Sequence, residues 1–211
     1  MKQGPILVVE DVPNVLELLE ITLRFKGYQV VSARDGLDGL EMIEKYNPVM
    51  VITDILMPRM DGYAFIQHIR TSNTEWSHIP VVFLSATYVT PEDKNFAMSL
   101  GATCFIEKPI DMEDFLLTVA EILSDEPSSR LAPLNNQDFY KGYRERLEQK
   151  LRHKNTKIAR AERLIPSLPE EQRSAFQSML QVSQNDRTDI QNELQEVYRM
   201  LDTFKKQDNQ T

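Results

Sequence analysis

Cysteine is almost absent from this sequence of 211 residues, and Cys104 alone cannot form a disulfide within the chain. No apolar run is long enough to span a bilayer, and the chain starts without the pattern of a signal peptide. Histidine is also scarce, and neither His68 nor His78 has other ligands at metal-site spacing. These absences argue against a disulfide-rich secreted protein and against an integral membrane protein. We therefore expect a soluble protein of the cytoplasm, with no membrane partner.

Charge is distributed unevenly along the chain, whose formal net charge is −8. Residues 1–124 contain 9 basic and 18 acidic side chains, whereas residues 125–211 contain 15 basic and 14 acidic ones. This contrast predicts two units with different roles. The acidity of the first unit argues against direct contact between that unit and nucleic acid.

Residues 1–124 alternate between short apolar runs, typical of buried strands, and longer stretches with apolar residues three and four positions apart, typical of helices. The expected strands are Ile6–Val9, Tyr28–Ser32, Val49–Asp54, Val81–Ser85 and Thr103–Ile106. The expected helices are Asn14–Lys26, Gly36–Lys45, Tyr63–Thr71, Pro91–Leu100 and Met112–Leu123. This alternation predicts right-handed crossovers and a parallel sheet covered on both faces. We therefore expect a five-stranded, doubly wound α/β domain.

A linker and two long helices are predicted after this domain. Residues 125–137 begin with serine, proline and charged residues, which is the composition of a linker. Heptad spacing then predicts two helices within residues 138–207, one over 138–165 and one over about 169–206. The motif Ser167-x-x-Glu170 between them predicts a capping box at the start of the second helix.

The short connection makes these two helices antiparallel neighbours, an all-α hairpin. Residues 140–165 carry nine basic and three acidic side chains, and residues 169–202 carry three basic and seven acidic ones. Opposite charge favours the pairing, although each exposed pair adds only about 0.2–1 kcal/mol. Folding about the loop predicts an ion pair between Glu148 and Arg187. One apolar stripe per helix buries little surface in a single hairpin, so we expect a homodimer in which residues 138–207 form a four-helix bundle.

Charged side chains stand where three of the predicted strands end. Asp54 closes its strand, Glu10 and Asp11 follow the first strand, and Lys108 follows the last. The carboxyl ends of parallel strands share one edge of the sheet, where ligands bind in open α/β folds. A turn with Pro58, Asp61 and Gly62 directly after Asp54 fits this placement. Three acids and a lysine at one edge predict a site for a divalent metal ion and a phosphoryl group.

These residues give the chain its resemblance to a known family. Residues 1–124 resemble the receiver domain of two-component response regulators, which implies a flavodoxin-like fold. In this resemblance Glu10 and Asp11 match the acidic pair, Asp54 the phosphoacceptor and Lys108 with Pro109 the family's lysine and cis-prone proline. The turn residues that also match are Pro58, Asp61 and Gly62. The hairpin resembles no family that we recognise.

The resemblance implies a mechanism at Asp54. A sensor histidine kinase supplies the phosphoryl group in the presence of Mg²⁺ (or Mn²⁺), for which Asp11, Asp54 and the backbone carbonyl of Leu56 are ligands and Glu10 binds through water. Lys108 pairs with a phosphoryl oxygen. The remaining family matches are Ser85 and Ala86, which contact the phosphoryl group, Phe105, the switch aromatic that rotates from solvent into space left by Ser85, and Leu56 and Thr87, which tune hydrolysis. An apolar Leu56 positions water poorly, so we expect the phosphoryl group to persist for minutes or longer.

Several simpler or different interpretations are open. Asp54 could be a strand-end acid that caps a turn, and the Glu10–Asp11 pair could be the N-cap of the following helix. His153 could be a phosphotransfer site of a phosphorelay, and the basic helix 140–165 could bind nucleic acid, which we consider less favoured than pairing with the acidic helix. The favoured interpretation is a phospho-accepting signalling protein, not an enzyme, whose output is contact with a downstream protein.

Overall fold

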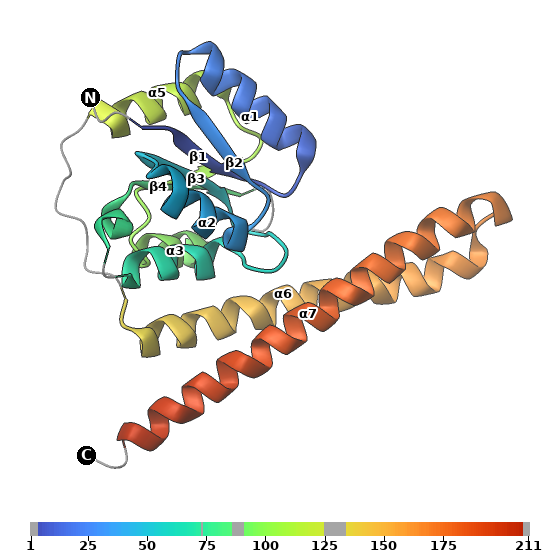
Figure 1. Cartoon of the computed structure of the whole chain (residues 1–211). Coiled ribbons are helices and arrows are strands. Elements are labelled where there is room, and N and C mark those ends of the chain that lie inside the picture. Colours follow the sequence, from blue (N-terminus) through green and yellow to red (C-terminus); the bar gives the residue numbers. More distant parts are fainter. Residues whose placement is uncertain (1–3, 73, 86–90, 125–133, 209–211) are drawn as a thin grey trace. The chain divides into compact units, whose positions relative to one another are not determined.

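The computed structural model describes residues 4–72, 74–85, 91–124 and 134–208 of the chain (Figure 1). The chain divides into two compact units, Met1–Leu134 and Asn135–Thr211. The first unit contains a single five-stranded sheet with its flanking helices, and the second is a helical hairpin. None of the helices in the described ranges combines the length and the apolar character needed to cross a membrane.

The sheet of the first unit is parallel throughout, with the strand order β2-β1-β3-β4-β5. Its strands are β1 (Ile6–Val9), β2 (Val30–Ala33), β3 (Met50–Asp54), β4 (Val81–Ser85) and β5 (Cys104–Glu107). The register sets Val9 beside Thr53 and Ser85 beside Glu107. The acidic and hydroxyl residues at the ends of β1, β3 and β4 therefore meet at one edge of the sheet.

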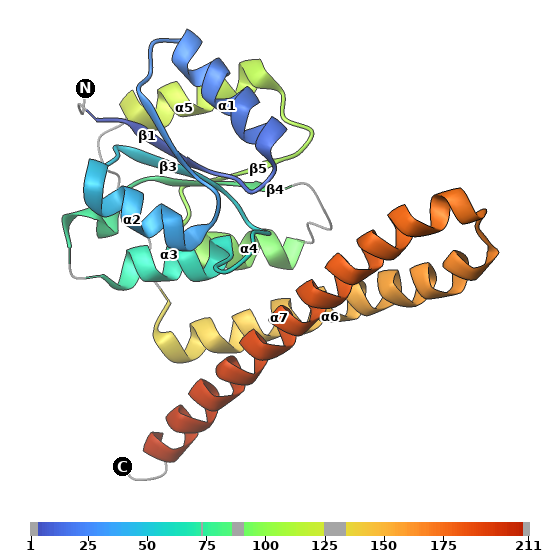
Figure 2. The same cartoon turned by 45° about the vertical axis from the view of Figure 1, so that its right-hand side comes forward.

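Helices cover both faces of this sheet. They are α1 (Pro13–Phe25), α2 (Gly36–Tyr46), α3 (Gly62–Thr71), α4 (Pro91–Ser99) and α5 (Met112–Ser124), with a 3-10 turn, η1 (Glu75–His78). Helices α1 and α5 lie on one face and α2, α3 and α4 on the other (Figures 1 and 2). On the α1/α5 face, Leu19, Leu23, Phe115 and Val119 pack against strand residues that include Ile52.

The predicted fold is confirmed, and the predicted ends of its elements lie within two residues of the observed ones. The largest strand difference is at β2, which begins at Val30 and not at Tyr28. The Tyr28 amide donates a hydrogen bond of 3.2 Å to the carbonyl of Leu23, and Gly27 has a φ of 88°. This part of the apolar run therefore ends α1 instead of joining the sheet.

The second unit consists of α6 (Asn136–Leu164), the 3-10 turn η2 (Ile165–Ser167) and α7 (Glu170–Asp208). The two helices pack along each other and run antiparallel. Of the stripe predicted for the first helix, Leu147 and Ile158 are buried in α6 and Ile165 is buried in η2, and the ring centroid of Tyr140 lies 6.0 Å from that of Phe204 in α7. The buried residues of α7, all in the predicted stripe, are Ile190, Leu194, Val197 and Leu201.

Two local predictions for the hairpin are wrong. The hydroxyl of Ser167 donates to the carbonyl of Leu164 at 2.7 Å, so it belongs to the end of α6 and does not cap α7. Glu148 does not pair with Arg187, because Glu148 accepts a hydrogen bond of 2.8 Å from the hydroxyl of Tyr198. The helices are thus aligned several residues away from the alignment that a symmetric fold about the loop predicts.

Candidate functional site

Three carboxylates gather at the carboxyl edge of the sheet. Glu10 and Asp11 follow β1, and Asp54 is the last residue of β3. One oxygen from each lies within 4.8 Å of the others, which is close enough for all three to contribute to one metal site. Glu10 is fully buried and Asp54 is 7% exposed. Hard oxygen donors of this kind suit Mg²⁺ or Mn²⁺.

Lys108 brings positive charge to the same carboxylates. Its ammonium donates to Asp54 Oδ2 at 2.6 Å and to Glu10 Oε2 at 2.7 Å. Burial alone lowers the pKa of Lys108, but its hydrogen bonds to the two acids outweigh this effect and the pKa is raised. Burial raises the pKa of Glu10, with a further increase from Asp54, while Lys108 acts in the opposite direction. The lysine therefore remains protonated and compensates part of the negative charge.

The other oxygen of Asp54 is held by the backbone that follows it. Asp54 Oδ1 accepts hydrogen bonds from the amides of Ile55 at 2.5 Å and of Leu56 at 3.2 Å. Asp54 therefore does cap the turn that follows its strand, while its other oxygen binds Lys108. The N-cap interpretation of the Glu10–Asp11 pair is not supported, because Val12 occupies the N-cap of α1 with no side-chain cap, and Glu10 instead accepts from the Val12 amide at 3.2 Å.

The turn after Asp54 is built by the predicted residues. Asp61 is the N-cap of α3, and its Oδ1 accepts from the amides of Tyr63 at 3.1 Å and Ala64 at 3.0 Å. Pro58 accepts from the amide of Met60 through its carbonyl. At Gly62 an added Cβ would lie 2.9 Å from Phe83 Cε1 and closer still to the carbonyl oxygen of Asp54. A side chain at residue 62 would therefore displace the backbone of Asp54.

Strands β4 and β5 bring the remaining predicted residues to this edge. Ser85 is 4% exposed, and its carbonyl accepts the amide of Lys108 at 2.7 Å, so the two residues are fixed side by side. The peptide between Lys108 and Pro109 is cis, as the resemblance implied. Ala86 and Thr87 lie outside the described residues. Leu56, by contrast, presents an exposed side chain.

Phe105 differs from the expectation that it rests in solvent. Its side chain is 8% exposed, and its ring centroid lies 6.4 Å from that of Phe83 in β4. An apolar ring without a hydroxyl has no polar group to satisfy when it is buried, which favours this inward position. The structure therefore shows the buried rotamer that the switch account assigns to the phosphorylated state.

Arg59 is a part of the site that the sequence did not reveal. It has a φ of 59°, and its guanidinium binds Asp35 (Nε to Oδ2, 2.6 Å) and Asp38 (Nη2 to Oδ1, 2.5 Å). Asp35 is the N-cap of α2, and the amide of Gly36 donates to the carbonyl of Met60 at 3.0 Å. The loop after Asp54 is thereby tied to the start of α2.

Comparison with known proteins agrees with this geometry. The model of the response regulator receiver domain matches residues 6–120. The chain belongs to this family. The match covers more than half of the chain and ends before the hairpin.

Individual proteins are similar to this response regulator over part of its length. The chain is 31% identical over 123 residues to a probable transcriptional regulator, ycf27, of Porphyridium aerugineum, covering 58% of this chain and 49% of the relative. It is 32% identical over 139 residues to a probable cyclic di-GMP phosphodiesterase of Vibrio cholerae, covering 66% and 31% respectively. A crystal structure of a response regulator from Chloroflexus aurantiacus matches with 31% identity and a TM-score of 0.55, covering 59% of this chain and all of that one.

The chain spans about half the length of the first of these curated relatives and less of the second. The similarity therefore identifies a two-component response regulator through its receiver domain. It does not carry the relatives' output activities to this chain.

Proposed function

We propose that this response regulator accepts a phosphoryl group on Asp54 from a sensor histidine kinase. The observation that carries the proposal is that one buried carboxylate, Asp54, lies within 4.8 Å of two further acids and accepts a hydrogen bond of 2.6 Å from the ammonium of Lys108. In the reaction an oxygen of Asp54 forms the new bond to phosphorus, and the bond between phosphorus and the kinase histidine breaks. The imidazole leaves with the bonding electron pair.

A divalent ion fits the donor set at this edge. Glu10, Asp11 and Asp54 supply carboxylate oxygens, and the backbone carbonyl of Leu56, two residues after Asp54, is the further ligand that the family resemblance implies. Bound Mg²⁺ or Mn²⁺ would offset the repulsion between the acids and an incoming phosphoryl dianion. Lys108 is a point charge suited to a phosphoryl oxygen. Its ammonium already lies beside the acceptor carboxylate of Asp54 and beside Glu10.

The response to phosphorylation runs through β4 and β5. The hydroxyl of Ser85 donates to another phosphoryl oxygen, with Ala86 as the small residue that the resemblance places beside it, and Phe105 stabilises the switched state from its buried position beside Phe83. Since Phe105 is already buried in this structure, phosphorylation stabilises an orientation that the chain can reach without it. Neither Leu56, with its exposed apolar side chain, nor the resemblance at Thr87 suggests fast hydrolysis, so the phosphoryl group persists for minutes or longer.

The hairpin supplies the output of the protein. We assign residues 138–207 to homodimerisation, after a linker at 125–137, and to contact with a downstream protein. The exposed apolar side chains of Met179 and Val182 on α7 support this assignment. In this role the protein acts in the cytoplasm as a signalling protein and catalyses no reaction beyond its own phosphorylation and dephosphorylation.

A labelling experiment tests the central step. The full chain is incubated with Mg²⁺ and a radiolabelled small phosphodonor, beside Asp54→Asn and a matched control, Glu121→Gln, which removes an exposed carboxylate on α5. We expect the parent and Glu121→Gln to incorporate acid-stable, alkali-labile label and Asp54→Asn to incorporate none. Equal labelling of Asp54→Asn would refute Asp54 as the acceptor. The decay of the label measures its lifetime, and loss within seconds would refute the slow hydrolysis.

The two other interpretations receive less support. The Nε2 atom of His153 is buried, which disfavours attack on a phosphoryl group. The basic side chain of Lys154 binds Asp186 of the acidic helix at 2.8 Å, as pairing within the hairpin predicts. Transfer of label to a second receiver that His153→Ala abolishes would favour the phosphorelay, and salt-sensitive retardation of DNA or RNA by the full chain would favour nucleic-acid binding.

A further inference from the structure

The two long sides of the hairpin differ in chemistry. On one side, which we call the Tyr198 face, Tyr198 donates to Glu148 at 2.8 Å and Gln184 donates to Glu162 at 3.3 Å. Residues seven positions apart share a side of a coiled-coil helix. Each of these bonded residues therefore places a whole series of residues, which we call a column, on the same side of its helix. The columns are Lys141, Glu148, Asn155 and Glu162 in α6 and Gln177, Gln184, Gln191 and Tyr198 in α7. Tyr198 is the one aromatic residue on a face that is otherwise polar.

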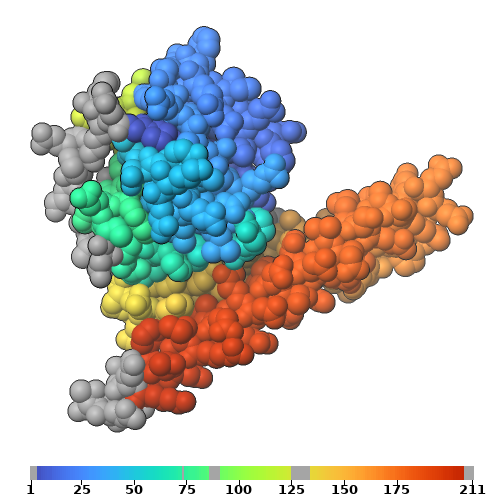
Figure 3. All heavy atoms as spheres, viewed as in Figure 1, coloured from blue at the N-terminus to red at the C-terminus, as the bar shows by residue number. Residues whose placement is uncertain are grey.

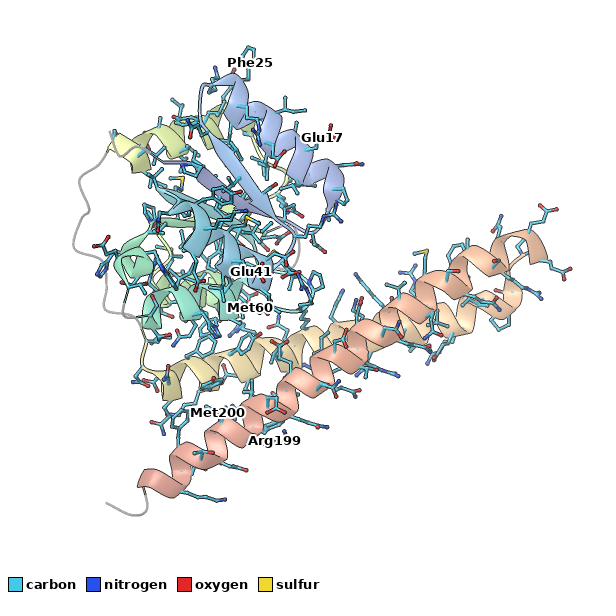
Figure 4. The ribbon with its side chains drawn as sticks, viewed as in Figure 1. Glu17, Phe25, Glu41, Met60, Arg199 and Met200 are labelled. Atoms are coloured by element: carbon cyan, nitrogen blue, oxygen red, sulfur yellow. The ribbon has the colours of Figure 1, made fainter. Side chains whose placement is uncertain are left out.

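The opposite side, which we call the Met179 face, is marked by two other contacts. Tyr143 donates to Glu193, and Lys154 donates to Asp186 at 2.8 Å. Steps of seven residues from Tyr143 and from Glu193, together with the residues three positions after these steps, give the part of this face that lies nearer the turn between the two helices. Its members are Lys157, Arg160 and Leu164 in α6 and Met179, Val182 and Asp189 in α7. Met200, labelled on α7, continues the column of Met179 (Figure 4).

Three apolar side chains on the Met179 face are exposed. Met179 is 64% exposed, Val182 59% and Leu164 41%. In the space-filling view α7 forms a continuous ridge, coloured orange to red (Figure 3). Contiguous exposed apolar groups on a soluble protein indicate a binding surface. The Tyr198 face, with its polar columns, offers no comparable patch in the same part of the hairpin.

The charged side chains around this apolar patch differ in sign between the two helices. Lys157 and Arg160 lie on the α6 half of the Met179 face and Asp189 on the α7 half. All three are exposed, and none makes an ion pair with any residue that the structure describes. The face is therefore basic along one helix and acidic along the other. A surface of that kind is complementary to a copy of itself.

We propose that the Met179 face is the contact between two copies of this chain, packed face to face about a two-fold axis parallel to the helices. This inference rests on the homodimer of the proposed function and names its surface and its symmetry. About such an axis α6 of one copy lies over α7 of the other at the same height. The dimer is then a four-helix bundle in which each helix has a neighbour of opposite charge.

The positions of the residues along the helix axes fit this arrangement. Within one hairpin Lys154 lies level with Asp186 and Glu162 with Gln184. Leu164 therefore lies level with residues 176–182, which include Met179, and Lys157 lies level with residues 183–189. Across the axis Leu164 meets the apolar residues of the partner subunit, and Lys157 meets its acidic ones. A two-fold axis perpendicular to the helices would set α6 over α6 and oppose like charges.

Substitutions on the two faces test the surface, using sedimentation of the full chain over a range of concentrations. Met179→Glu and Val182→Glu are each expected to raise the dimer dissociation constant at least about tenfold, because each sets a charge in the apolar centre. The matched controls Gln177→Glu and Gln191→Glu add the same charge to the same helix on the Tyr198 face. They are expected to change the constant less than about twofold. Circular dichroism verifies that every variant keeps its helices.

A charge exchange tests the symmetry. Lys157→Glu and Asp189→Lys are each expected to weaken the dimer, and the double variant to recover most of the loss, because position 157 then meets the opposite charge again. Cross-linking gives a second measure in a Cys104→Ser background. Chains with Leu164→Cys mixed with chains with Met179→Cys are expected to form disulfide-linked pairs on oxidation. A mixture of Glu162→Cys and Gln177→Cys chains, on the Tyr198 face, is expected to form none.

The outcomes separate this inference from the proposed function. A dimer that is insensitive to Met179→Glu, or that cross-links through the Tyr198 face, overturns the assigned surface and leaves the homodimer in place. A chain that is monomeric at every concentration overturns both. Labelling of Asp54, measured on the same samples, decides the phosphoacceptor role independently of either result.

Discussion

Gly62→Ala is the substitution for which the structure gives the most definite expectation. The new Cβ would stand 2.9 Å from Phe83 Cε1 and 3.0 Å from Ile55 Cα, and closer still to the carbonyl oxygen of Asp54. Two of these three atoms belong to the backbone and cannot rotate away. Overpacking of a buried site costs about 1–3 kcal/mol, and a rigid backbone contact places this substitution near the upper end, at about 3 kcal/mol.

The single tryptophan of the chain makes the measurement selective. Trp76 lies in η1 of the first unit, so its fluorescence follows the unfolding of that unit and not of the hairpin. A loss of about 3 kcal/mol lowers the midpoint of a domain of this size by roughly ten degrees. Because the clash displaces the backbone of Asp54, the rate of labelling at Asp54 is expected to fall as well.

Gly27→Ala is the matched control. Gly27 has a φ of 88° but no atom within 4 Å of an added Cβ, so only the backbone conformation opposes alanine, at a cost of about 1–2 kcal/mol. We expect Gly62→Ala to melt clearly below Gly27→Ala. If the two variants melt together, or if Gly62→Ala keeps the parent's midpoint, the close approach of residue 62 to Asp54 is not a real constraint and our account of the turn is wrong.

Three further predictions concern other parts of the chain. Arg59→Gly is expected to be more stable than Arg59→Ala by about 1 kcal/mol in urea unfolding, because both lose the bonds to Asp35 but glycine accepts the φ of 59°; equal stability would contradict this. Millimolar Mg²⁺ is expected to raise the midpoint reported by tryptophan fluorescence, since it binds only the folded site, and the rise should shrink in Asp11→Asn. Burial lowers the pKa of His153 in the folded chain below the 6.5 of a free histidine. As the pH falls, His153 is therefore protonated at a higher pH in the unfolded chain than in the folded one, and hairpin stability should decrease as the pH drops through about 6.5. His153→Asn should remove that part of the pH dependence in thermal melts followed by circular dichroism.

Most of the fold and of the site could be predicted because the signals were local. Each strand is a short apolar run, and Asp54, the proposed phosphoacceptor, stands at the end of one of them. The sheet's carboxyl edge and the meeting of Glu10, Asp11 and Asp54 there therefore followed from the alternation of strands and helices. The turn at Asp61 and Gly62 was equally visible, since both residues act within the segment that contains them.

What could not be predicted depends on contacts between distant segments. The bonds of Arg59 reach Asp38 and Asp35, which stand 21 and 24 residues earlier in the chain, and no pattern in either segment specifies the other. The pairing of Glu148 with Tyr198 depends on where the connection between the helices ends, and the 3-10 turn at 165–167 shifts that point. Phe105 adopts its inward rotamer because of Phe83 on a neighbouring strand, which spacing does not reveal.

The position of Lys108 has a consequence for how the central event is communicated. The lysine follows β5, which pairs only with β4 in the described sheet, whereas its partner Asp54 ends the middle strand. A border strand can shift at the smallest cost in ladder hydrogen bonds, because one of its sides is unpaired. In the function proposed above, Lys108 therefore links phosphorylation of the middle strand to the border strand, which also carries Phe105.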